Sequence, residues 1–110
     1  MELAFDTKSL RTICESEPHA KRELGPNTAE TLKHRLADMH AATSPKDLIA
    51  GRPRELAGTG SQRLMALDLS DGLCIVFCAN HPKAPTTGGG DLDWSRVNRV
   101  KILRIGNADG

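Results

Sequence analysis

The chain has 110 residues, of which 38% are hydrophobic, which is enough for one domain with its own core and no disulfide or metal support. A net charge of +1 gives no sign of nucleic-acid binding through total charge. No apolar run reaches membrane-spanning length and no secretory leader opens the chain, so we expect a cytoplasmic protein without a membrane partner. Its three cysteines, Cys14, Cys74 and Cys78, should then be reduced.

The first half of the chain is typical of one strand followed by helices. Residues 1–6 alternate like a short strand, and a helix is expected from Ser9 onward. Pro18 should kink this helix or begin a second one, which Gly25 ends. The clearest helix follows, with apolar residues at helical spacing up to Met39 and a start that resembles a capping box at Asn27 and Glu30.

The second half is typical of strands. Ser44 and Pro45 predict one short helical turn, and residues 64–69 then alternate as a strand does. Asp71-Gly72 predicts a hairpin into residues 73–78, whose two apolar faces indicate a central strand. Residues 81–93 should form a loop and residues 97–105 the last strand. We expect one α+β domain over residues 1–110, with an N-terminal strand, two to three helices, and a three-stranded antiparallel C-terminal sheet with the helices on one face.

Basic residues gather in two segments of this neutral chain. Residues 96–104 contain four cations and no acid: Arg96, Arg99, Lys101 and Arg104. A second segment holds Arg52, Arg54 and Arg63, with only Glu55 against them. If the two segments meet, they form a local surface for an anionic ligand, and otherwise they are ordinary solvated arginines.

The order of elements resembles the RelE/ParE toxin fold, and five segments resemble its HigB-like branch of plasmid killer proteins. These segments are LRTICESE, LKHRLADMHAA, GRPRELAG, LDLSDGLCIVF and GGGDLDWSRVNRVKILRI. The resemblance spans nearly the whole chain and keeps the order of the segments. It implies a toxin of a type II toxin–antitoxin system, neutralised by a small helix-turn-helix antitoxin of the HigA kind.

Active members of this family bind the ribosome and cut mRNA without a metal or cofactor. A base deprotonates the ribose 2′-hydroxyl, cations stabilise the phosphorane, and an acid protonates the leaving 5′-oxygen. The resemblance implies Arg54, Arg63 and Asp109 as candidate catalytic residues, and His81 is added because it begins a loop beside the central strand. The resemblance also implies contacts from Arg52, Arg99, Lys101 and Arg104 to RNA phosphates, because a guanidinium matches phosphate oxygens and stays charged.

The sequence departs from the family pattern at three places. Arg54 stands where many HigB-like toxins carry a histidine, and Cys74 stands where an arginine is usual. Residues 107–109, Asn-Ala-Asp, stand in place of a D-Y-H triplet. Two alternatives therefore remain beside the endonuclease: a non-cleaving protein that binds the antitoxin and RNA, and a ParE-like topoisomerase inhibitor.

The spacing of Cys74, Cys78 and His81 also suggests a metal site. Cysteines four residues apart on a strand are separated by about 13 Å, which is too far for both to bind one zinc ion. We therefore expect buried free cysteines and no metal. Trp94 is expected to pack on the core and hold the preceding loop.

Overall fold

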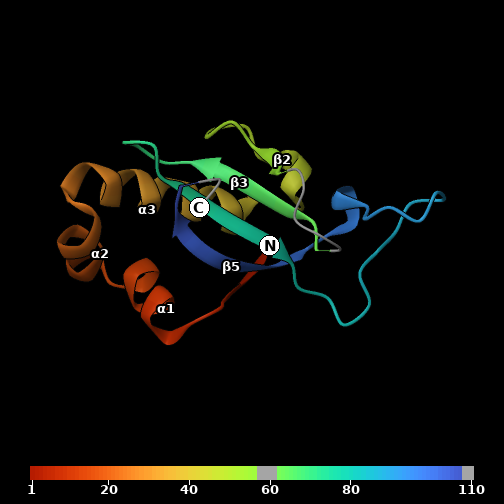
Figure 1. Ribbon diagram of the computed structural model, residues 1–110, viewed down its shortest axis with the longest axis horizontal. Coiled ribbons are helices and arrows are strands. Elements are labelled where there is room, and N and C mark those ends of the chain that lie inside the picture. Colours follow the sequence, from red (N-terminus) through yellow and green to blue (C-terminus); the bar gives the residue numbers. More distant parts are fainter. Residues whose placement is uncertain (57–61, 108–110) are drawn as a thin grey trace.

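The computed structural model describes residues 1–56 and 62–107 (Figure 1). The helices are α1 (Lys8–Glu15), α2 (Glu17–Leu24) and α3 (Pro26–Ala41), with 3-10 turns at Pro45–Asp47 and Trp94–Arg96. The strands are β1 (Glu2–Phe5), β2 (Arg54–Leu56), β3 (Leu64–Asp68), β4 (Cys74–Ala79) and β5 (Arg99–Gly106). The α+β class is confirmed.

The sheet differs from the three-stranded antiparallel sheet that we expected. It is mixed and has five strands in the order β1-β5-β4-β3-β2, with β1 parallel to β5 and the other pairs antiparallel. The additional strands are the two edges. The N-terminal strand joins the sheet beside β5, and β2 has only three residues, too few to show an alternating pattern in the sequence.

The breaks between the helices follow local chemistry. Thr7 caps α1 and Ser16 caps α2, and each side chain accepts a backbone N–H of the first turn. Pro18 lies in the first turn of α2, so it begins a second helix, and Gly25 ends that helix with a φ of 86°. The expected capping box at Asn27 is wrong, because α3 already begins at Pro26, directly after this turn.

The helices supply one side of the main core, and one face of the sheet supplies the other. The helical side chains are Leu10, Ala20, Ala29, Leu32, Leu36 and Met39. The sheet side chains are Met65, Leu67, Ile75, Phe77, Val100 and Ile102, which alternate along β3, β4 and β5. The hydrophobic effect therefore fixes which face of the sheet the helices cover, and it leaves the opposite face for other contacts.

The hairpin between β3 and β4 is confirmed. Asp71 and Gly72 both have positive φ, 57° and 77°, as a type I′ turn requires. β4 lies in the centre of the sheet, and Ile75, Val76 and Phe77 are fully buried on its two faces. None of the helices in residues 1–56 and 62–107 has the length and apolar character that a bilayer crossing requires.

Candidate anion-binding face

The sheet face turned away from the helices carries most of the basic residues singled out in the sequence. We call it the basic face. A second, smaller apolar cluster forms its floor: Leu64, Ala66, Cys74, Val76 and Cys78. These residues alternate with those of the main core, so they point to the opposite side of the same strands.

One cross-strand row on this face begins and ends in arginine. The register pairs Arg54 of β2 with Ala66 of β3, Ala66 with Val76 of β4, and Val76 with Arg104 of β5. Three strand spacings separate the Cα atoms of Arg54 and Arg104 by about 14 Å. Arg54 and Arg104 thus stand at the two ends of a row whose middle residues, Ala66 and Val76, are small, apolar and fully buried.

Asp68, at the end of β3, is the centre of the polar contacts on this face. Its Oδ2 accepts a hydrogen bond from Nε of Arg52, and its Oδ1 accepts one from Nη1 of Arg54 at 3.0 Å. The thiol of Cys74 donates to the same Oδ1 at 3.3 Å. Two guanidinium groups from the segment before and in β2 therefore converge on one carboxylate of β3.

These contacts fix the charges of the cluster. The hydrogen bond from Arg52 is the main reason that the pKa of Asp68 falls from 3.8 to about 2, and the bonds from Cys74 and Arg54 add to the effect. Burial opposes the charge on Arg54, but its hydrogen bonds to Asp68 and Cys74 outweigh burial and raise its pKa. Burial and the hydrogen bond to Asp68 raise the pKa of Cys74. Near neutral pH the cluster is two cations, one anion and a neutral thiol.

A backbone turn with two consecutive positive φ angles positions Arg52 beside Asp68. Gly51 has a φ of 89° and Arg52 a φ of 48°, although Arg52 carries a side chain and precedes Pro53. The turn is fastened to β3, because the Gly51 carbonyl accepts the N–H of Asp68 at 2.6 Å. A Cβ on Gly51 would lie 2.8 Å from Nε of Arg35 and 3.1 Å from the Asp68 carbonyl oxygen. Glycine is therefore favoured here by both conformation and space.

The basic residues of β5 extend the same face toward β1. Lys101 lies opposite Cys78 in the register, and its Nζ is 3.9 Å from a carboxylate oxygen of Asp6. Arg99 pairs with Glu2 at 2.8 Å, near the start of the strand. Arg104 donates through Nη2 to the carbonyl of Asn107 at 3.3 Å. Acids on β1 and directly after it therefore offset part of the positive charge at the β1 edge.

The structure places Arg63, another candidate residue, away from this cluster. Nε of Arg63 donates to Glu55, and its Nη1 is 3.6 Å from Asp91. Glu55 in turn accepts from Trp94, a residue of the main core, so this ion pair belongs to the helix side of β2 and β3. Arg63 therefore does not join Arg52, Arg54 and Arg104.

His81 also lies away from this cluster. His81 begins the loop after β4, and its Nε2 accepts the backbone N–H of Asn98 at 3.2 Å. This contact links the two ends of the loop, at the far end of β4 from Cys74 and Asp68. Asp109 lies outside the described residues.

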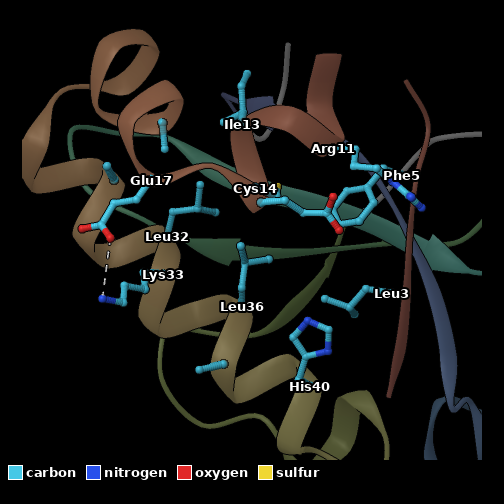
Figure 2. A pocket seen from close by; sticks show the side chains of 14 residues that line it. Leu3, Phe5, Arg11, Ile13, Cys14, Glu17, Leu32, Lys33, Leu36 and His40 are labelled. Carbon is cyan, nitrogen blue, oxygen red and sulfur yellow. Dashed lines mark ion pairs between the residues drawn. The ribbon is translucent and has the colours of Figure 1, made fainter. Parts of the chain in front are cut away.

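A pocket of about 450 Å³ lies on the helix side, between β1 and the three helices (Figure 2). Apolar side chains form much of its wall: Leu3, Phe5, Ile13, Leu32 and Leu36. Its charged groups have both signs. Glu17 and Lys33 are 4.0 Å apart at one end, and the guanidinium of Arg11 lies over the Phe5 ring, 5.4 Å from its centroid. This mixed lining does not favour an anion, so the pocket is separate from the basic face in both position and chemistry.

The cysteines are free, and the expected burial of Cys74 and Cys78 is confirmed, at 3% and 2% exposed. In residues 1–56 and 62–107, no three His, Cys, Asp or Glu side chains gather closely enough to share a metal ion. Within the described residues, the cluster around Asp68 thus offers guanidinium groups, one ionised carboxylate and a neutral thiol as its chemistry.

Asp68 is the central residue of this candidate site that sequence reasoning missed. Its signal was present, since Leu64, Ala66 and Asp68 alternate with Met65 and Leu67 and must share a face. The partner register that brings Arg54 to this face depends on β2, which the sequence pattern did not reveal. Comparisons with protein-family models, with curated proteins and with solved structures find no match to this chain.

Proposed function

We propose that this protein is a RelE/ParE-like toxin of a type II toxin–antitoxin system, whose basic face binds the mRNA backbone on the ribosome. The observation that carries the proposal is the row Arg54–Ala66–Val76–Arg104, with Arg52 beside it. Guanidinium groups over a small apolar floor suit a sugar–phosphate chain, because each fork can hold two phosphate oxygens. The resemblance of five sequence segments to HigB-like toxins implies that the partners are the ribosome and a HigA-like antitoxin.

The activity proposed is cleavage of mRNA. The ribose 2′-oxygen loses its proton and attacks the adjacent phosphorus, which forms a 2′,3′-cyclic phosphate. The bond from phosphorus to the 5′-oxygen breaks, and this oxygen takes up a proton. Arg54 and Arg104 would stabilise the charge that develops on the phosphorane, in the way that positioned cations lower such barriers. Lys101 would contact the neighbouring backbone.

Binding without cleavage is the second candidate function, and the proton-transfer groups favour it. A general base works best with a pKa near the operating pH, whereas the pKa of Asp68 is about 2. His81 uses Nε2 to hold Asn98 at the other end of β4. The described part of the basic face is therefore better equipped to hold a phosphate than to move a proton.

Induction of the protein in a bacterial host separates these functions. The proposal expects growth arrest and new mRNA 5′ ends within translated codons, detected by primer extension. Growth arrest and ribosome binding without new ends would establish the second candidate. Arrest with broken DNA and intact mRNA would instead indicate a topoisomerase inhibitor, and no effect on growth would contradict the toxin proposal.

Arginine-to-alanine variants on and away from the basic face test whether this face is responsible for growth arrest. The double variant Arg54→Ala, Arg104→Ala should abolish growth arrest. Arg22→Ala removes an exposed guanidinium from α2, on the helix side, and should leave the arrest unchanged. Arg63→Ala should also keep it, because Arg63 pairs with Glu55 away from the basic face. Full toxicity of the double variant would overturn the assignment of this face.

A further inference from the structure

The Asp68 carboxylate occupies the place between two arginines where an external anion would bind. Its two oxygens accept from different guanidinium groups, Oδ2 from Arg52 and Oδ1 from Arg54. The side chain of Arg52 is 75% exposed and that of Arg54 is 32% exposed, so solvent reaches both. We call these two residues the arginine clamp.

The clamp would recognise phosphate by the geometry that it now uses for carboxylate. Guanidinium groups bind both anions through N–H donors directed at oxygen lone pairs. A carboxylate carries one negative charge shared by two oxygens. A phosphodiester within RNA likewise carries one negative charge on two free oxygens. An RNA phosphate is therefore a close chemical substitute for the side chain of Asp68.

The backbone around Asp68 is held independently of its carboxylate. Its N–H donates to Gly51 at 2.6 Å, and its carbonyl accepts from Nε of Arg35 at 3.1 Å. β3 also pairs with β4 through this position, since Asp68 lies opposite Cys74. The carboxylate can therefore release the clamp while the turn and the strand keep their places.

We propose that Asp68 is an internal competitor for phosphate, which fills the arginine clamp of the free protein and is displaced when a phosphodiester of RNA binds. This inference rests on the proposed function for the identity of the anion as RNA. The competition itself concerns only the clamp and any phosphate. Its consequence is a lower affinity for isolated anions, so that binding needs further contacts along the face, such as those of Arg104 and Lys101.

The test compares two variants that remove one negative charge each. Asp68→Asn empties the clamp of its anion, and Asp71→Asn makes the same charge change at the exposed hairpin turn, where asparagine tolerates the positive φ. Inorganic pyrophosphate and a single-stranded RNA are titrated at constant ionic strength, because both affinities depend on salt. Asp68→Asn should bind both about tenfold more tightly than the wild type, and Asp71→Asn should match the wild type.

The outcomes distinguish the competition from the proposed function. Tighter pyrophosphate binding by Asp68→Asn, without RNA binding by any variant, would support the competition and contradict the RNA-binding function. Equal RNA affinity for the wild type and Asp68→Asn would leave the function standing and overturn the competition. An equal gain in Asp71→Asn would also overturn it, because the effect would then come from net charge alone.

A measurement on the wild type keeps the inference testable if Asp68→Asn does not fold. The side-chain Nε–H of Arg52 donates to Asp68, so its NMR signal reports the occupant of the clamp. Pyrophosphate should shift this signal and the carboxyl carbon signal of Asp68 along the same saturable curve. Binding of pyrophosphate with both signals unchanged would show that the anion binds elsewhere, and the inference would be wrong.

Discussion

The indole N–H of Trp94 donates a 3.1 Å hydrogen bond to Glu55, and this bond joins the turn before β5 to the edge strand β2. The Trp94 ring also packs edge-on against Phe77 of β4, with 6.4 Å between the ring centroids. Glu55 accepts from Arg63 as well, and this bond is the main reason that its pKa is lowered. Trp94 thus holds the loop that precedes it against the core and against the edge strand β2.

Trp94→Phe should therefore destabilise the fold. It keeps an aromatic ring but removes the donor to Glu55, and such a loss costs about 1 kcal/mol, with a further cost for the smaller ring. Urea unfolding followed by circular dichroism measures the change, because the variant lacks the only tryptophan. Glu55→Gln is the companion variant, since its amide oxygen can still accept from the indole while the charge that pairs with Arg63 is lost. Unchanged stability in Trp94→Phe would contradict this role.

Gly51→Ala should be more harmful than the same change at Gly72. Both glycines have a positive φ, 89° and 77°, so both variants bear a conformational cost of about 1 kcal/mol. At Gly51 the new Cβ would lie 2.8 Å from Nε of Arg35 and 3.1 Å from the Asp68 carbonyl oxygen, so both must shift, whereas nothing lies within 4 Å at Gly72. The midpoints of urea unfolding for the two variants give the comparison. An equal loss of stability in the two variants would contradict this prediction, because it would show that the Arg35 side chain moves aside at no energetic cost.

Stability should fall in acid in a way that depends on Asp68. Its pKa is lowered from 3.8 to about 2 in the folded protein, so its stabilising contribution is complete above about pH 5 and is lost progressively as the pH falls to 2. The contribution is about 1 kcal/mol, because the partly exposed carboxylate is screened by solvent. The difference in unfolding free energy between the wild type and Asp68→Asn, measured from pH 6 to pH 2, isolates it. A difference that does not change across this range would contradict the ion pairs.

Cys14 should react slowly with thiol reagents. Burial, with a smaller contribution from Glu15, raises its pKa from 9.0 to about 11. At pH 8 its thiolate fraction is then about a hundredfold lower than that of an ordinary cysteine, and the reaction rate should fall with it. Burial also raises the pKa of Cys74 and of Cys78. Stopped-flow modification of the native protein with a disulfide reagent measures these rates, and rapid labelling of Cys14 would show that its thiol is not shielded.

Features that depend on neighbouring residues were predictable from the sequence. Asp71-Gly72 specifies its turn through the backbone freedom of those two residues, and Pro18 and Gly25 mark helix ends for the same kind of reason. The central place of β4 also followed, because a strand with apolar residues on both faces must be covered on both.

Features that depend on register were not predictable. The partner of β1 is about a hundred residues away, and β2 is too short to carry a pattern. Without β2 there was no way to tell which face Arg54 would take. Arg63 could have been placed better, because its alternation with Met65 and Leu67 already assigned it to the core side. The anionic centre at Asp68 emerged only once the register of β2 and β3 was known.

The parallel pairing of β1 with β5 affects how the molecule is made. Glu2 lies beside Arg99, so β1 gains its partner in the sheet only after β5 has been synthesised. Folding must therefore bring together two segments about a hundred residues apart, and such non-local pairings slow folding because the entropy of loop closure must be overcome first. Because β5 also supplies Arg104 and Lys101, a nascent chain that stops before this strand cannot assemble the complete basic face.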